Sequence, residues 1–356
     1  MAQIVWFENY QPADAAVLGG KNSSLGTLFR AGLPVPPGFA VAADCYRKAL
    51  ADGGLSSKLD ALVAAVDPRD PASVAATGQL ARTLIGSLEP PADLAGAIQD
   101  AYAQLCGRCG DQVPVAVRSS ATCEDSPDAS FAGEHDTYLW VRGGDEVVRH
   151  VLRCWASLFT DRGIAYRLER GYGGTSAAMS VGVQQMVTPR AAGVAFTLNP
   201  TNGDRSQIAI DASWGFGEAV VSGEVTPDNF LVDKVMGTIT RRTISAKTLE
   251  YRLTDADAVT AVPVEAERQS VPCLTDDEIL AVARLARRAE KHYRCPQDVE
   301  WALEASGDVL LLQSRPETVW SRRARPAASC TADPITSMVQ TLLNPSHGTP
   351  EGHGHG

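Results

Sequence analysis

Three polar side chains near the C-terminal end have the types and spacing of a phosphate and metal site. Glu300 lies on a strand predicted over residues 298–304, and Gln313 and Arg315 lie on the next, over 309–315. Because side chains alternate between the faces of a strand, Gln313 and Arg315 share one face. A carboxylate and an amide oxygen on adjoining strands can bind Mg²⁺, and an arginine beside them can neutralise phosphate. An edge-strand ion pair is the alternative interpretation.

A second candidate is an arginine at the end of a predicted strand. Valines alternate over residues 113–117, as on a half-buried strand that runs into a stretch of hydroxyl residues. An arginine fork with hydroxyl and amide donors beside it can clamp a phosphate. A polar surface loop explains the same residues equally well. The candidates here are Arg118, Ser119, Ser120 and Thr122.

A third candidate is Lys21, which follows two glycines in a turn predicted over residues 19–22. A helix is expected from about residue 23 to residue 31, and a helix N-terminus favours an anion. The spacing is not that of a P-loop. Taken alone, Lys21 also fits an ordinary exposed turn lysine.

A glycine-rich segment after the strand predicted at 208–212 is the fourth candidate. Gly215-Phe216-Gly217 follows Trp214, and backbone of this kind can approach a nucleotide closely. The segment does not complete the Rossmann fingerprint. Tight turns between strands account for it equally well, so no ligand is assigned to it.

The helices and strands that must position these residues are predicted from hydrophobic periodicity and from the turn residues that bound each segment. Helical spacing dominates residues 40–107 and returns over 145–168, whereas short apolar runs bounded by Gly, Asn, Asp or Pro predict strands. Thr275 and Glu278 form a capping box for a helix that runs to about Tyr293. Mixed elements of this kind indicate an α+β or α/β chain. The further strands are expected at 4–7, 179–187, 193–198, 208–212 and 229–232.

Composition excludes several classes of partner. The chain has 356 residues, and 32 Lys+Arg minus 42 Asp+Glu gives a net charge of −10. Nucleic acid and anionic membranes need a basic footprint, so neither is expected as a partner. No run approaches the roughly 20 apolar residues of a membrane span, and the first ten residues do not resemble a secretory signal. We therefore expect a cytoplasmic protein of two or three packed units.

The cysteines agree with that compartment. Eight are scattered along the chain, and Cys106 and Cys109 form the single close pair. A zinc site would need a second pair or suitably spaced histidines. Reduced structural thiols are therefore expected.

Several segments together resemble a known family. They are residues 19–24, 33–41, 117–133, 193–199 and 217–228, with Asp298-Val299-Glu300-Trp301 and Gln313-Ser314-Arg315-Pro316. In this order they resemble the N-terminal ATP-binding domain of phosphoenolpyruvate synthase and pyruvate phosphate dikinase, which rifampin phosphotransferases share. The resemblance implies an α+β chain with an ATP-grasp fold. Its lobes would be residues 1–190 and 191–320, followed by a flexible tail over 321–356.

The resemblance also implies roles for individual residues. Lys21, Arg118 and Arg315 would bind the triphosphate and act in catalysis. Glu300 and Gln313 would bind Mg²⁺, with Mn²⁺ as a substitute. ATP is thus the expected nucleotide. Its remaining contacts would be Ser119, Ser120 and Thr122 in a phosphate-covering loop, and Gln185, Met186 and Val187 on the adenine strand.

The family also uses a histidine domain that this sequence does not show. In the family, that histidine accepts the β-phosphoryl group of ATP within a glycine-rich motif, and His347 near the end of the chain does not match it. We therefore expect a separate partner subunit that carries the phosphohistidine. This layout resembles the ATP-binding subunit of phenylphosphate synthase, with phenol as the final acceptor. The alternatives are a split phosphoenolpyruvate synthase that uses pyruvate, a truncated rifampin phosphotransferase, and a non-catalytic ATP-sensing subunit.

Overall fold

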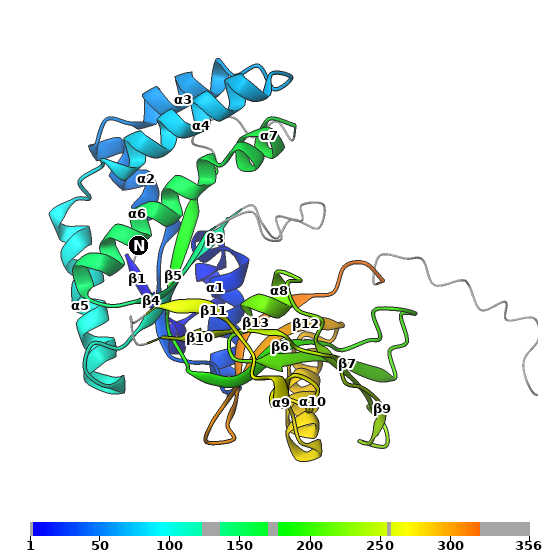
Figure 1. The fold of residues 1–356 in the computed structure, drawn as a ribbon. Helices are drawn as coiled ribbons and strands as arrows, with labels where there is room; N and C mark the ends of the chain where they lie inside the picture. Colours follow the sequence, from blue (N-terminus) through cyan, green and yellow to red (C-terminus); the bar gives the residue numbers. More distant parts are fainter. Residues whose placement is uncertain (1–2, 123–135, 170–176, 255–257, 321–356) are drawn as a thin grey trace, which may run out of the picture. The chain divides into compact units, whose positions relative to one another are not determined.

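Two larger β-sheets carry most of the residues singled out above (Figure 1). The computed structural model describes residues 3–122, 136–169, 177–254 and 258–320. Met1–Glu317 form one compact unit and Thr318–Gly356 a second. The predicted tail with His347 and the part of the predicted phosphate-covering loop after Thr122 lie outside the described residues.

The first sheet has five antiparallel strands in the order β1-β2-β5-β3-β4. Helix α1 covers one of its faces, where Asn22 donates a hydrogen bond to Ser180 (2.9 Å). On the opposite face, the Cys154 thiol of α6 donates to the Val117 carbonyl. The strands are β1 (Ile4–Trp6), β2 (Gly38–Val41), β3 (Val115–Ala121), β4 (Thr137–Val141) and β5 (Met179–Gln185).

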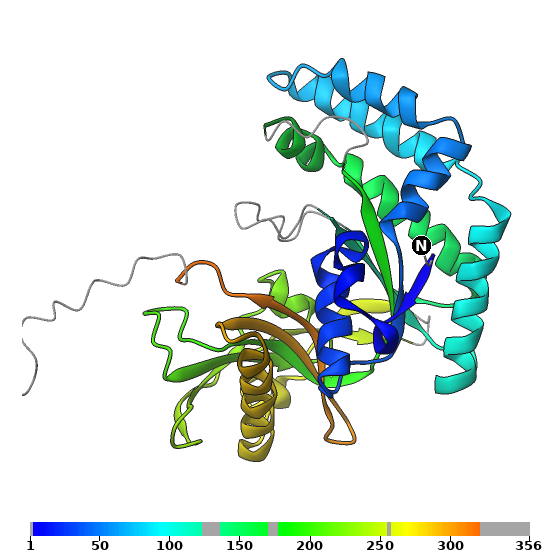
Figure 2. The same ribbon diagram turned by 180° about the vertical axis from the view of Figure 1, so that it is seen from behind.

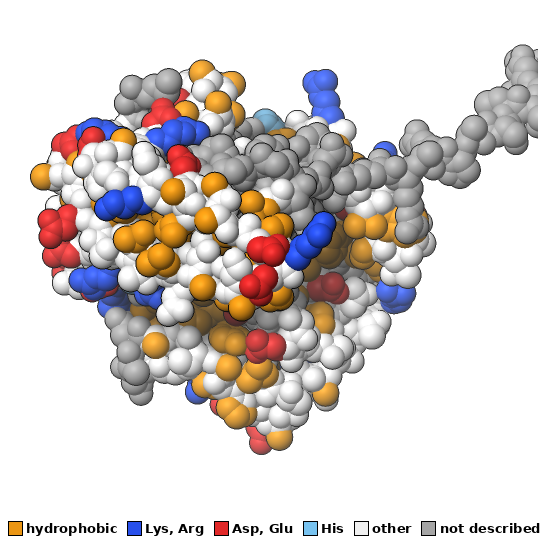
Figure 3. Space-filling model, turned by 90° about the horizontal axis from the view of Figure 1, so that it is seen from above, with side chains coloured by type: hydrophobic (Ala, Val, Ile, Leu, Met, Phe, Trp, Pro, Cys, Tyr) orange, Lys and Arg blue, Asp and Glu red, His pale blue; other side chains and the backbone are white. Residues whose placement is uncertain are grey.

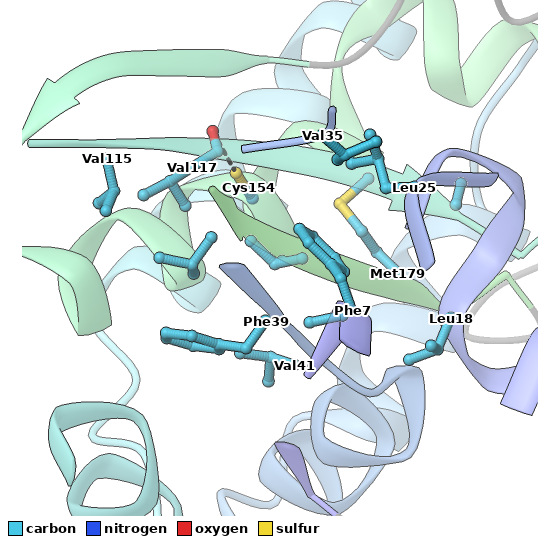
Figure 4. Packing of buried hydrophobic residues seen from close by; sticks show 14 of the residues in the cluster. Phe7, Leu18, Leu25, Val35, Phe39, Val41, Val115, Val117, Cys154 and Met179 are labelled. Carbon is cyan, nitrogen blue, oxygen red and sulfur yellow. Dashed lines mark hydrogen bonds between the residues drawn. The ribbon is translucent and has the colours of Figure 1, made fainter. Parts of the chain in front are cut away.

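The core of this sheet is built from alternate side chains of its strands. Figure 4 labels Phe39, Val117 and Met179 of these strands among the buried hydrophobic residues, together with Phe7. These side chains are almost fully buried, and removing apolar area from water is the main stabilising contribution to folding. Burial also raises the pKa of the Cys154 thiol, so it packs as a small neutral side chain.

Helices surround the first sheet, and those predicted over residues 40–107 are confirmed. Strand β2 was missed, because its four residues lie between a proline-rich connector and a helix. The predicted 145–168 helix is interrupted by a 3₁₀ turn. The helices are α1 (Ala15–Arg30), α2 (Ala43–Asp52), α3 (Ser56–Ala64), α4 (Pro71–Gly86), α5 (Ala92–Cys109), α6 (Gly144–Ala156) and α7 (Asp161–Glu169), with 3₁₀ turns η1 (Phe7–Asn9), η2 (Pro12–Asp14) and η3 (Ser157–Phe159).

The second sheet has six strands in the order β13-β12-β6-β7-β8-β9. One face packs on α10 (Asp276–Tyr293), which begins with the predicted capping box at Thr275 and Glu278 (Figure 2). The strands are β6 (Pro189–Phe196), β7 (Gln207–Trp214), β8 (Asp228–Asp233), β9 (Ile239–Thr243), β12 (Gln297–Glu304) and β13 (Val309–Pro316). Short helices α8 (Glu218–Val221) and α9 (Ala266–Gln269) and the hairpin β10 (Leu249–Leu253) and β11 (Val259–Pro263) complete this part.

The two sheets are joined by one short connection and by contacts between segments far apart in the sequence. Strand β5 ends at Gln185 in the first sheet and β6 begins at Pro189 in the second, so three residues connect them. Strand β13 also contacts the N-terminal region, since the Ser24 hydroxyl of α1 donates to the Ser314 carbonyl (2.8 Å) and Leu311 N–H donates to Pro34 O (2.8 Å). These contacts fix β13, which carries Gln313, against α1, which carries Lys21.

One face of the molecule carries charges of both signs. On the face seen in Figure 3, Lys and Arg side chains lie among Asp and Glu side chains and do not gather into one basic patch. Within the described ranges, no helix is long and apolar enough to cross a lipid bilayer.

Candidate functional site

The structure brings three of the predicted site residues into direct contact. Arg118 donates from Nη2 to Gln313 Oε1 (2.9 Å) and to Glu300 Oε2 (3.2 Å). Its other terminal nitrogen, Nη1, donates to the carbonyl oxygen of Leu312 (3.1 Å). The Arg118 and Glu300 side chains are 18% and 26% exposed, so this cluster is open to solvent.

The pairing of β12 with β13 explains how Glu300 and Gln313 come together. The two residues are direct partners across the antiparallel pair, and a β-bulge follows, since Trp301 pairs with Leu311. Leu312 is therefore the extra residue, and its carbonyl accepts from Arg118. The bulge lets Leu311 lie fully buried in the core while Gln313 faces Glu300.

Glu300 lies on the sheet face that is turned away from α10. Val299 and Trp301, on the other face, are fully buried in the same core as Val282 of α10. The Glu300 face carries a separate, small apolar cluster made of Val187, Ala192, Ala302, Leu310 and Leu312. An apolar surface thus lies beside a charged one, a combination typical of ligand sites.

Arg315 makes a different contact from the one expected beside Gln313. Its Nε and Nη2 atoms both lie 2.8 Å from Asp298 Oδ2, and the two residues are direct strand partners. Burial raises the pKa of the Asp298 carboxyl, and Arg315 opposes this only in part. Sequence reasoning gave Asp298 no role, although its position two residues before Glu300 places it on the same strand face.

The predicted turn around Lys21 is part of a helix instead. Helix α1 runs through it with a kink at Gly19, whose φ of 65° is left-handed. A Cβ at Gly19 would lie 2.6 Å from Ser120 Oγ, so only glycine permits this close approach. Lys21 therefore lies in the first turn after the kink, beside the end of β3. The sequence predicts a helix N-terminus just after Lys21. In the structure, the helical segment that follows the kink begins before Lys21, so a helix N-terminus still lies next to this residue.

The serines after Arg118 lie on β3, and not in a loop. Ser120 is fully buried; its hydroxyl donates to Leu18 O (3.0 Å) and accepts from Asn22 N–H (3.4 Å). It therefore bridges the kink of α1. The hydroxyls of Ser119 and Thr122 donate to the carbonyls of Asp136 and Ala178.

The predicted adenine strand lies at the end of β5. Gln185 is the last residue of that strand, and Met186 and Val187 follow in the connection between the sheets. Gln185 N–H donates to Pro37 O (2.9 Å) and Met186 N–H donates to Pro114 O (2.8 Å). These two amide donors hold the first sheet together. Val187 contributes its side chain to the small apolar cluster on the Glu300 face.

Sequence reasoning missed a chain of polar side chains on the same face. Strand pairing aligns Glu300 with Val194, Asp211 and Asn229 across four strands. Asn229 donates to Asp211 Oδ1 (2.7 Å) and accepts from Arg241 (3.0 Å). No local pattern marks these residues, because strand pairing alone brings them into line with Glu300.

The donor set of Glu300 and Gln313 fits a hard divalent cation. Glu300 Oε2 and Gln313 Oε1 converge on one point, because a single cationic nitrogen, Arg118 Nη2, lies within hydrogen-bond distance of both. Mg²⁺ prefers oxygen ligands and is commonly held by one or two protein groups together with water and substrate phosphates. Mn²⁺ accepts the same ligands.

Comparison with protein families gives one match that spans most of the chain. Residues 15–333 match the family described as "Pyruvate phosphate dikinase, AMP/ATP-binding domain". The matched range contains all the predicted site residues.

Individual relatives agree with that match. Probable phosphoenolpyruvate synthases of Methanocaldococcus jannaschii and Methanothermobacter thermautotrophicus are 42% and 44% identical, over 89% and 88% of this chain. A rifampicin phosphotransferase of Streptomyces sviceus is 44% identical over 88%. The chain spans 27%, 46% and 36% of the lengths of these three proteins.

Solved structures give a weaker likeness. The ATP-grasp ligase PsnB, solved with precursor peptide PsnA2 and AMPPNP, is 12% identical, with a TM-score of 0.28 over 93% of this chain and 60% of that one. The α+β class predicted from the sequence is confirmed by the two sheets and their helices.

Proposed function

Because this chain belongs to the pyruvate phosphate dikinase AMP/ATP-binding domain family, we propose that it is the ATP-binding part of a dikinase-type phosphotransferase. It would pass the β-phosphoryl group of ATP to a histidine on a partner subunit. AMP and phosphate would be released. The observation that carries this proposal is the convergence of Arg118, Glu300 and Gln313 from two sheets on one solvent-accessible face.

Two surfaces beside each other on that face support a position for the nucleotide. The apolar cluster around Val187 and Leu312 suits a flat, weakly polar base. The phosphates would then extend toward Arg118, with Lys21 at the helix N-terminus and Arg315 two residues from Gln313. Three cationic side chains suit a triphosphate, since arginine binds phosphate through a planar fork and lysine acts as a point charge.

We propose the two sheets as the two lobes of an ATP-grasp fold. The start of β6 at Pro189 supports a boundary near residue 190. Residues 1–190 would form one lobe and 191–320 the other. The hydroxyls of Ser119, Ser120 and Thr122 already bond to backbone carbonyls, which supports a role in shaping the phosphate-facing strand over a direct phosphate contact.

In the proposed reaction, this chain would position the triphosphate and neutralise its charge. A histidine nitrogen of the partner attacks the β-phosphorus, and the bond to the oxygen shared with the α-phosphorus breaks, so that AMP leaves with that electron pair. Water then releases the γ-phosphate, which leaves a phosphohistidine. Such transfers depend mainly on alignment and on stabilising charge at the oxygens. Bound Mg²⁺ would add Lewis-acid stabilisation at Glu300 and Gln313.

The final acceptor is the finer part of the proposal. The layout suggested phenylphosphate synthase, with phenol as acceptor. The relatives named phosphoenolpyruvate synthase support pyruvate at least as well. A comparison of AMP formation with phenol and with pyruvate, in the presence of the partner subunit, separates the two.

The decisive experiment follows the β-phosphoryl group. ATP labelled at the β-phosphorus is incubated with the chain and a co-expressed histidine-domain protein, and acid-labile label on histidine is measured. We expect labelling with the native chain and loss of labelling with Arg118→Ala. Normal labelling with Arg118→Ala would contradict the site, and ATP binding without any labelling would favour an ATP-sensing subunit.

A further inference from the structure

The guanidinium of Arg118 lies where the proposed metal ligands converge. Nη2 is 2.9 Å from Gln313 Oε1 and 3.2 Å from Glu300 Oε2, while Nη1 is 3.1 Å from Leu312 O. Three oxygen acceptors of the second sheet therefore surround one cationic group of the first. A divalent cation bound by Glu300 and Gln313 would have to occupy much of the same space.

From this geometry we propose that Arg118 acts as a stand-in cation in the nucleotide-free chain. Its guanidinium neutralises Glu300 and excludes the metal until nucleotide phosphates draw it away. The inference rests on the proposed function only where it takes nucleotide phosphates to be the ligand that draws Arg118 away. Nucleotide and metal would then bind with positive coupling, because the phosphates free the two oxygens and also add metal ligands.

Arginine chemistry explains why a phosphate can displace this contact. At Glu300 and Gln313, one nitrogen of the guanidinium is shared between two oxygens from different residues. A phosphate offers a bidentate, charge-assisted pair of hydrogen bonds, which is the stronger arrangement for a planar fork. The partial exposure of Arg118 leaves room for the side chain to move.

Arg315 provides the internal contrast. It bonds through two nitrogens to a single carboxylate oxygen of Asp298, away from the Glu300–Gln313 pair. Removing Arg315 changes the net charge by the same amount as removing Arg118, and at a position two residues from Gln313. Arg315→Met is therefore a matched control for Arg118→Met, and both replacements keep most of the side-chain volume.

The test measures Mn²⁺ binding without nucleotide, by electron paramagnetic resonance of the free ion. We expect Arg118→Met to bind Mn²⁺ at least about tenfold more tightly than the native chain. Arg315→Met should stay close to the native value, and Arg118→Met with Glu300→Gln should lose the gain. Thermal unfolding of each variant confirms that it is folded.

Three results would overturn the stand-in role. They are equal Mn²⁺ affinity in the native chain and Arg118→Met, an equal gain in Arg315→Met, and a gain that survives Glu300→Gln. Arg118→Lys offers a second measurement, since it keeps a cation and should bind Mn²⁺ as weakly as the native chain. Because no measurement here uses phosphoryl transfer, a failed labelling experiment with an intact Mn²⁺ gain would reject only the proposed function.

Discussion

Two charged clusters lie in adjacent rows of the same six-stranded sheet, on opposite faces. One row aligns Glu300 with Asn229, and the next aligns Trp301 with Asp228. On the α10 side, Asp228 and Lys247 form an ion pair of 2.7 Å whose side chains are fully buried. On the other side, Arg118 and Glu300 make a longer contact and remain partly exposed.

The difference between the clusters is hydrogen-bond saturation. Asp228 accepts from Lys247 Nζ and Ser245 N–H at Oδ1, and from Cys273 N–H at Oδ2, while Lys247 also donates to Ser245 O. Three of these bonds join separate chain segments, and the fourth links Lys247 to Ser245 two residues before it. The Arg118 cluster instead shares one nitrogen between two oxygens in reach of water. Burial and saturation thus mark a structural pair, whereas exposure with shared donors is what we expect of the proposed ligand site.

The largest expected effect is on stability, at the buried pair. Asp228→Asn should lower the free energy of unfolding by about 3–5 kcal/mol, because it leaves the buried Lys247 charge without its partner. Urea unfolding measures this loss. Asp228→Asn combined with Lys247→Met should be less destabilised than the sum of the single variants. A loss below about 1 kcal/mol in Asp228→Asn would contradict the assignment.

The same carboxylate-to-amide change on the opposite face should act on function. Glu300→Gln should change the free energy of unfolding by less than about 1 kcal/mol, since a partly exposed ion pair contributes little. Phosphoryl transfer should fall by about 100-fold or more, because a charge that would hold the proposed metal is lost. Unfolding and AMP formation are measured on one preparation. A large stability loss in Glu300→Gln would remove the distinction between the two faces.

A smaller effect on stability is expected at Ser120. It tests whether this side chain shapes the site or binds the ligand directly. Ser120→Ala should cost about 1–2 kcal/mol of stability, because Leu18 O and Asn22 N–H lose their buried bridge. Ser213→Ala is the control, since the buried Ser213 hydroxyl has no hydrogen-bond partner in the described part of the chain. That control should be neutral or slightly stabilising. If the two variants match, the bridge contributes nothing.

The smallest effect is a pH dependence at the start of α10. Burial raises the pKa of Glu278, but hydrogen bonds from Thr275 and Arg190 outweigh it, and the net pKa lies below the ordinary 4.5. The stabilisation from Glu278 is therefore complete above pH 4.5 and is lost as the pH falls through the folded-state pKa. Unfolding of the native chain and Glu278→Gln across this range should converge at low pH. A difference that stays constant with pH would contradict the shift.

Local patterns predicted the hairpin and the long helix closely. The capping box at Thr275 and the turn before Val309 are short-range signals, so α10, β12 and β13 lie within one or two residues of their expected bounds. The bulge at Leu312 left no signal among three consecutive leucines. The sequence predicts a turn at Gly19, whereas the structure has a kink within a helix. The backbone angle φ of Gly19 distinguishes a turn from a kink, and the close approach to Ser120 sets that angle.

The sequence by itself determined α10, β12 and β13, the shared face of Gln313 and Arg315, and the family to which the chain belongs. Only the tertiary structure decided that Arg118 contacts residues 182 and 195 positions later in the chain, and that Arg315 pairs with Asp298 instead. The physical reason is range: periodicity and capping act over a few residues, whereas a contact between two sheets depends on strand register and on the packing of every element between them.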